Sequence, residues 1–241
     1  MITYEYLLLK FEEFMNFKKW RGFTLAEVLI TLGIIGIVAA MSIPTIMSKI
    51  YEKRTVTQLK AAQSILSQAI KASEDEYGDA PSWFNGYTGS KTAQEIADKL
   101  KPSLKIAVDC GISDPKGYCV KRTYLRKNGQ KHDVNYATNT SYYKIVLLNG
   151  TAIWWKASDS SERRRGSYIV FFIDTNGIDL PNTWGKDLFV FAYENGGIKP
   201  WGARDSIYPY DTTCKPPSSI GYGCAYWVVH NQDLSYLKIK K

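Results

Sequence analysis

A long apolar segment near the N-terminus constrains the fold of this chain more than any other feature. Residues 23–47 read FTLAEVLITLGIIGIVAAMSIPTIM and carry a single charge, Glu27. As an α-helix this segment is ~37 Å long, enough to cross a hydrocarbon core of ~30 Å. Lys18, Lys19 and Arg21 come just before it, so the positive-inside rule places them in the cytoplasm and the rest of the chain on the far side.

The amino-acid composition disfavours several classes of protein function. The chain is 45% hydrophobic with a net charge of +8, which excludes wholesale disorder and permits anionic partners without demanding them. It has only two histidines, His132 and His230, and no C-x-x-C, so a zinc site or a His-rich active site is disfavoured. Since no nucleophile elbow, Walker loop or zinc-protease motif is present either, we expect no enzymatic activity.

Three interpretations compete for the apolar segment. A cleaved secretory signal would use a site after Val38-Ala39-Ala40, but the apolar run continues well beyond it. A plain membrane anchor fits the length and leaves Glu27 as an interfacial residue near the helix N-terminus. Placing a carboxylate in the apolar phase costs roughly 2.5–3.5 kcal/mol on insertion scales, so the presence of Glu27 in this segment needs an explanation. The third interpretation supplies one.

The ten residues 18–27, KKWRGFTLAE, resemble the processing site of type IV pilins and of the related pseudopilins of type II secretion. The resemblance covers the end of a leader and the whole apolar helix. It implies that a prepilin peptidase cuts between Gly22 and Phe23 and that Phe23 is then N-methylated. Residues 1–22 would be the leader, and Met15 offers an alternative start to Met1.

The resemblance also implies roles in assembly. Glu27 lies four residues after the new amine of Phe23, on the same helix face, and can pair with its own amine or with that of a neighbouring subunit. The family role is the pairing between subunits. Gly36 and Pro44 fall where relatives have residues bracketing a segment that unwinds in the filament. From its chemistry alone, Pro44 should kink the helix or melt the turn before it.

The helix is expected to continue into water as an amphipathic half, with an apolar face formed by Leu59, Ala62, Leu66, Ala69, Ser73 and Tyr77. The predicted fold is α+β: a long helix over residues 23–77, membrane-spanning at 23–47, packed on a roughly four-stranded antiparallel sheet in a pilin-like roll. Residues 78–241 would form a soluble, β-rich head. A short helix is predicted at 92–100, capped by Thr92 and Glu95. The predicted strands are residues 143–148, 151–157, 167–173 and 187–193.

Two further features concern ligands and cross-links. Asp174, Asn176 and Asp187 are weak candidates for a Ca²⁺ site, weighed against turn chemistry without metal, which we favour. The four cysteines allow three connectivities in an oxidising compartment. We expect the sequential pairs Cys110–Cys119 and Cys214–Cys224, the second of which resembles the disulfide-bounded C-terminal loop of many pilins.

The sequence therefore predicts a structural subunit of a type IV pilus-like filament. It would wait as a single-pass inner-membrane precursor and then join an extracellular or periplasmic filament. Its partners would be other pilin-like subunits, the prepilin peptidase, an inner-membrane assembly platform and lipid before assembly. The alternatives are a type II secretion pseudopilin and an adhesive or DNA-binding minor pilin; DNA binding rests only on a basic run, Arg163–Arg164–Arg165, and is disfavoured.

Overall fold

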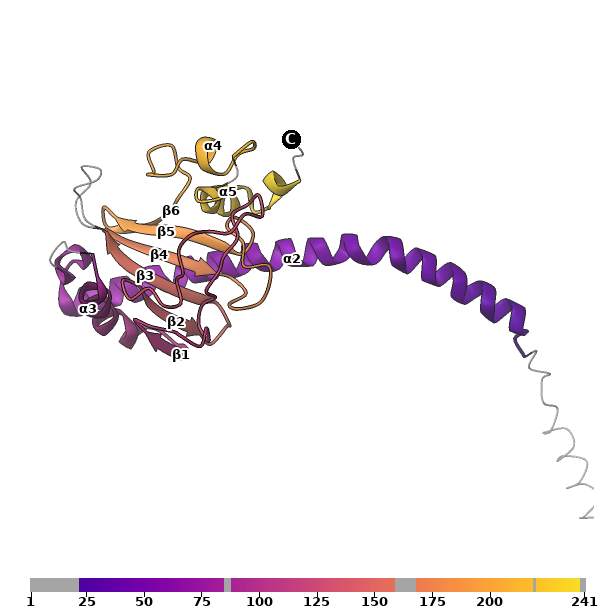
Figure 1. Cartoon of the computed structure of the whole chain (residues 1–241), viewed down its shortest axis with the longest axis horizontal. Helices are drawn as coiled ribbons and strands as arrows, with labels where there is room; N and C mark the ends of the chain where they lie inside the picture. The colour runs from indigo at the N-terminus through magenta and orange to yellow at the C-terminus, as the bar shows by residue number, and fades with distance from the viewer. Residues whose placement is uncertain (1–21, 85–87, 159–167, 219, 239–241) are drawn as a thin grey trace, which may run out of the picture. The chain divides into compact units, whose positions relative to one another are not determined.

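The computed structural model describes residues 22–84, 88–158, 168–218 and 220–238, and the chain divides into two units, Met1–Lys49 and Ile50–Lys241. Helix α2 covers Leu25–Tyr77 and contributes to both units (Figure 1). In the first unit its large apolar side chains are exposed. Among the described residues, α2 is the one helix long and apolar enough to cross a bilayer.

The second unit, the head, is built on a six-stranded antiparallel sheet in the sequential order β1-β2-β3-β4-β5-β6. Its strands are β1 (Ile106–Gly111), β2 (Tyr143–Leu147), β3 (Ala152–Ser158), β4 (Tyr168–Asp174), β5 (Leu188–Glu194) and β6 (Gly197–Pro200). The four predicted strands correspond to β2–β5. The prediction of four strands was too low, because the two edge strands carry weaker sequence signals.

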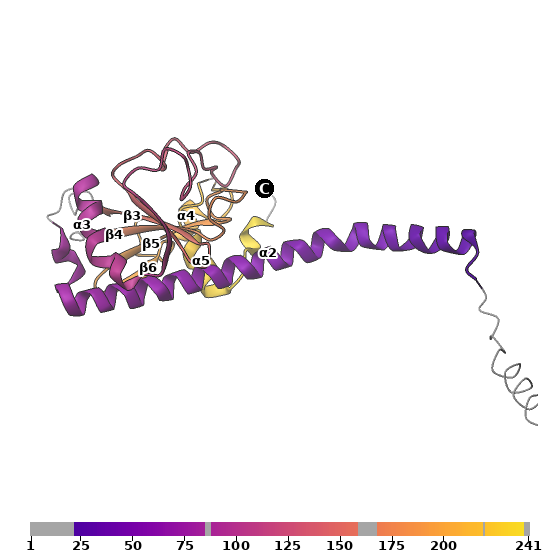
Figure 2. The ribbon, with the colours of Figure 1, turned by 90° about the horizontal axis from the view of Figure 1, so that it is seen from below.

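Both faces of the sheet are buried, which explains the nearly continuous apolar runs of β3 and β4. On β3, Ile153 and Trp155 belong to the core beneath the helices, whereas Trp154 points into a second core on the opposite face. The head part of α2 lies along the first face (Figure 2). Its predicted apolar stripe is buried at Leu59, Ala62, Leu66, Ala69 and Ser73, but the prediction was wrong for Tyr77, which is exposed at the end of the helix.

Shorter helices complete the head. They are η1 (Ala80–Trp83), α3 (Ser90–Leu100), η2 (Lys101–Ser103), α4 (Tyr210–Thr213), α5 (Cys224–Asn231) and η4 (Ser235–Leu237). Helix α3 confirms the predicted helix but starts two residues earlier, with Gly89 at the N-cap position. The predicted capping box was therefore wrong, because Thr92 lies inside the helix and is buried.

The second core is covered by irregular chain, much of it residues 112–142, and this covering is held by two buried polar side chains. The carboxylate of Asp114 accepts the backbone N–H groups of Tyr118, Cys119 and Val120 at 2.8–3.0 Å. The fully buried ammonium of Lys144, on β2, donates to the carbonyls of Ile112, Asn139 and Tyr142. Each group pairs with backbone polar atoms of the irregular segment, which has few regular backbone hydrogen bonds of its own.

The structure contains both sequential disulfides, Cys110–Cys119 and Cys214–Cys224, and no free cysteine among the described residues. The first ties the end of β1 to the covering segment. The second closes the loop before α5, next to Gly185. Gly185 has φ +72°, and a Cβ there would lie 2.7 Å from the Sγ of Cys224, so only glycine fits.

Candidate processing and assembly site

The amino end of α2 carries a reciprocal cap that joins Thr24 and Glu27. The backbone N–H and the hydroxyl of Thr24 donate to Oε2 of Glu27 at 2.9 and 2.8 Å, and the N–H of Glu27 donates to the Thr24 hydroxyl at 3.2 Å. This is a capping box, with Thr24 at the N-cap and Glu27 three residues later. The four letters TLAE were enough to predict it, but the sequence analysis considered Glu27 only as a charge.

The cap leaves part of the Glu27 carboxylate available. Both hydrogen bonds go to Oε2, and no hydrogen bond to Oε1 is found within the described part of the chain. A cationic amine can therefore approach Oε1 while the cap stays in place. The same carboxylate can start the helix and receive an amine, either that of its own Phe23 or that of a neighbour.

The predicted cleavage point lies directly before this cap. Phe23 has an exposed fraction of 83%, and Gly22 is exposed as well. A Cβ built on Gly22 would meet no described atom within 4 Å, so packing within the chain does not require glycine there. The requirement would instead come from the peptidase. The basic residues Lys18, Lys19 and Arg21 lie outside the described residues, and cleavage between Gly22 and Phe23 stays a prediction.

Gly36 and Pro44, the two other predicted assembly residues, lie within α2. No described atom lies within 4 Å of a Cβ built on Gly36, which leaves room on this side of the helix for close approach by another helix. The helix is continuous through Pro44, so the expected melting of the preceding turn is not seen. Pro44 still lacks the N–H that would bond the carbonyl of Ala40, and the predicted unwinding in a filament remains an expectation.

Of the candidate calcium ligands, the two carboxylates are engaged within the protein, whereas the buried side-chain oxygen of Asn176 has no hydrogen-bond partner among the described residues. The oxygens of Asp187 accept the backbone N–H groups of Asn182 and Thr183, both at 2.6 Å. Asp174 is fully buried and accepts the hydroxyl of Tyr124 at 2.9 Å. The side-chain amide of Asn176 donates to the carbonyls of Asp179 and Leu180. The contacts of the two carboxylates and of the Asn176 amide group are typical of turn chemistry.

Among the described residues, one group of three potential metal ligands comes together, namely Cys110, Asp114 and Cys119. Its two sulfurs form a disulfide, and Asp114 is occupied by three backbone N–H groups. A disulfide sulfur is not the thiolate that binds metals. This cluster is therefore structural.

The two buried carboxyl groups predict how the stability of the head depends on pH. Burial raises the pKa of Asp187 to about 6, and burial followed by the negative charge of Asp187 raises the pKa of Asp174 well above its ordinary value. The folded head then binds protons more tightly than the unfolded chain. For Asp187 the stabilisation is complete below about pH 4 and is lost as the pH rises through about 6, and the raised pKa of Asp174 acts in the same direction. Urea unfolding, followed by tryptophan fluorescence, should give a free energy of unfolding about 1–3 kcal/mol higher at pH 4.5 than at pH 7.

A matched variant isolates this effect. Asp174→Asn keeps an acceptor for Tyr124 but removes one titrating group, so the dependence on pH should become weaker. A parent protein whose stability rises steadily from pH 4.5 to 7 would contradict the prediction.

Comparison with known families identifies the motif at the amino end of α2. Residues 19–43 match the family model of the prokaryotic N-terminal methylation motif, which is the prepilin signature of type IV pilins and pseudopilins. Together with a long apolar helix that continues onto an antiparallel sheet, this motif defines a type IV pilin-like or pseudopilin protein. Beyond the motif, residues 45–224 match a family of unknown function (DUF6613), and the chain belongs to that family. Neither the curated proteins nor the solved structures gave a match.

Proposed function

We propose that this protein is a structural, non-catalytic subunit of a type IV pilus-like filament. It waits as a single-pass inner-membrane precursor, is cleaved after Gly22 and methylated on Phe23, and is transferred from lipid into a polymer. The core of that polymer is a bundle of the apolar helix segments. The energy comes from burying the same apolar surface that lipid covers in the precursor, with extraction powered elsewhere by an assembly platform.

One observation carries the proposal: a methylation motif is joined to an apolar helix segment that no described residue of the chain covers. Along residues 25–47 the large apolar side chains are exposed, from Leu25 at 79% to Met47 at 58%. Exposed apolar surface of this extent marks a contact with lipid or protein. A signal removed after export would need neither the Glu27 carboxylate beside the cleavage point nor the continuous helix into the head.

N-terminal mass analysis of protein sheared from cells tests the proposal. The expected product begins at N-methylated Phe23 and retains both disulfides. A product that begins near Met41 would indicate an ordinary secretory signal. A chain that keeps its leader would indicate a permanent anchor, and either result would refute the filament subunit.

The methylation motif is shared with pseudopilins, so a type II secretion pseudopilin is the alternative within the same class. The two differ in where the polymer ends up. A pilus subunit is recovered in the sheared extracellular fraction at its normal level of expression. A pseudopilin stays with the cell envelope, and its deletion stops the secretion of other proteins.

A further inference from the structure

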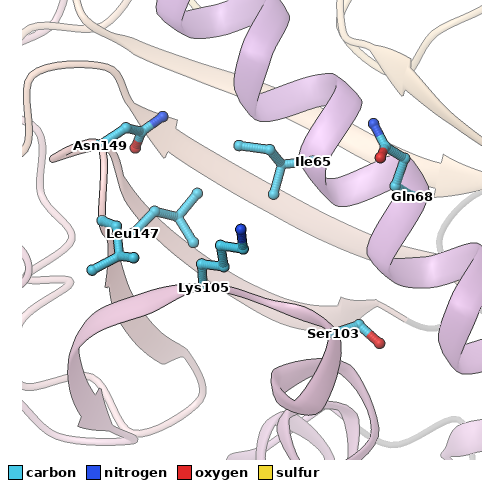
Figure 3. A pocket seen from close by; sticks show the side chains of 7 residues that line it. Ile65, Gln68, Ser103, Lys105, Leu147 and Asn149 are labelled. Carbon is cyan, nitrogen blue, oxygen red and sulfur yellow. The ribbon is translucent and has the colours of Figure 1, made fainter.

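An open groove lies beside the head part of α2. Its volume is about 360 Å³, and it is lined mainly by apolar surface from Ile65 on α2 and from Leu147 and Leu148 at the end of β2. Lys105, just before β1, extends its ammonium group into the space between Ile65 and Leu147 (Figure 3). Within the described chain Lys105 has no ion-pair partner, and Leu148 is 70% exposed. The groove thus offers apolar walls and one unpaired cation.

The loop between β4 and β5 presents the complementary chemistry. Leu180 is 83% exposed, Ile178 is 39% exposed, and the exposed Asp179 lies between them. This tip is held in shape because the side-chain amide of Asn176 donates to the carbonyls of Asp179 and Leu180 at 3.1 and 2.9 Å. The loop therefore offers two apolar side chains around one anion, and Asp179 has no ion-pair partner in the part of the chain that the structure describes.

We infer that the tip formed by residues 178–180 of one copy docks in the groove of a neighbouring copy. Leu180 would enter between Ile65 and Leu148, and Asp179 would pair with Lys105. The tip does not fill the groove of its own chain, since Leu180 and Leu148 are both exposed. The inference rests on the proposed function, because the polymer is what brings the copies together.

The groove and the tip are different surfaces of the head, so their contact can be head-to-tail. The groove opens between α2 and the β1 edge of the sheet, and Asn149 of the β2–β3 turn lies at its rim. The tip belongs to the β4–β5 loop, which lies against the same turn: the carbonyl oxygen of Gly150 is 2.8 Å from a Cβ built on Gly177. The groove and the tip are therefore two different surfaces at one end of the sheet. A contact between two different surfaces can repeat from copy to copy, and it generates an open helical polymer when the rotation between copies does not close a ring. A single leucine and one ion pair are too little to hold free heads together. In a bundle of packed helices the local concentration is high, and a weak contact is then sufficient.

Charge reversal in the full-length chain tests this contact. We expect Lys105→Glu and Asp179→Lys each to lower the yield of sheared filament several-fold, since each places like charges together. Both positions are exposed, so the chain level and the disulfides should not change. The double variant, Lys105→Glu with Asp179→Lys, should restore most of the yield. Lys91→Glu is the matched control: it reverses the charge of an exposed lysine on α3 that does not line the groove, and it should assemble like the parent.

Disulfide trapping supplies a second readout. Leu180→Cys combined with Ser103→Cys, which lines the groove, should give an oxidant-dependent ladder of many copies, because each copy uses a different surface on either side. Leu180→Cys with Lys91→Cys should give none. In the trapping experiment, the contact is overturned if only dimers form or if no cross-link forms. In the charge-reversal experiment, it is overturned if the single variants assemble like the parent or if the double variant is worse than either single variant. If the parent forms no filament, the proposed function fails and the contact with it; if the parent polymerises and the variants have no effect, only the contact fails.

Discussion

Glu27→Gln should almost abolish filament formation while leaving the head folded. In the proposed polymer core, the methylated amine of Phe23 lies in apolar surroundings and is neutralised by the carboxylate of Glu27. Removing one partner of a buried ion pair costs about 3–5 kcal/mol, because the other charge stays buried and unpaired. The amount of protein in the sheared fraction, relative to the total, should therefore fall at least about tenfold.

The capping box makes this variant a clean probe of charge. Glutamine at the third helical position can also bond back to a threonine N-cap, so Glu27→Gln retains the cap that Thr24 and Glu27 form. Thr24→Val is the matched control, since it removes the hydroxyl of the cap and keeps the carboxylate. If Glu27 acts only by starting the helix, Thr24→Val should be as damaging as Glu27→Gln.

Two measurements show that the defect lies in assembly. The mass of the membrane-bound protein should show normal cleavage before Phe23, and limited proteolysis should release the same disulfide-linked head fragment as in the parent. A Glu27→Gln protein that is recovered in filaments at the parental level would refute the role of the charge pair.

The strongest sequence patterns predicted the central parts of the fold. The stripe on the head part of α2 and the four central strands were predictable because each element has a long run with a consistent period. Strand β1 was not located from the sequence, because its pairing with β2 is irregular at two points and its side chains do not alternate regularly between buried and exposed. Strand β6 spans only four residues and directly follows a glycine turn. Helix α5 was missed because Cys224 was considered only as the end of a disulfide loop.

At the candidate site, prediction went furthest where residues close in sequence act together. Thr24 and Glu27 are three residues apart, so local geometry alone determines their bond. The groove beside Ile65 has walls that are far apart in sequence, at residues 65–68, 103–105 and 147–149. Its existence depends on how α2 crosses the sheet, and no periodic pattern contains that information. The same limit applies to the chain that covers the second face of the sheet.

Lys144 shows why that covering chain could not be predicted. It alternates with Tyr143 and Ile145 on β2, a pattern that normally indicates a lysine facing water. The segment 112–142 instead folds over this face and buries the side chain completely. Burial lowers the pKa of Lys144 to about 8, an effect that the negative charge of Asp114 opposes, so the group is still mainly an ammonium ion at pH 7. Its three hydrogens bond the carbonyls of Ile112, Asn139 and Tyr142 at 2.7–2.9 Å.

Lys144→Met should destabilise the head by about 3 kcal/mol, because methionine fills a similar volume but leaves three buried carbonyl groups without this donor. Relief from burying a charge acts in the opposite direction. We expect the lost bonds to dominate, since only one side of the interaction is removed and the carbonyls cannot reach water while the segment stays in place.

Urea unfolding of the detergent-solubilised chain at pH 7, with the disulfides intact, measures the difference. Lys199→Met, on the exposed edge strand β6, is the matched control and should change the stability by no more than about 0.5 kcal/mol. If Lys144→Met is as stable as the parent, the free-energy cost of burying the ammonium equals the stabilisation from its hydrogen bonds. The covering segment would then be held mainly by the aromatic core beneath it.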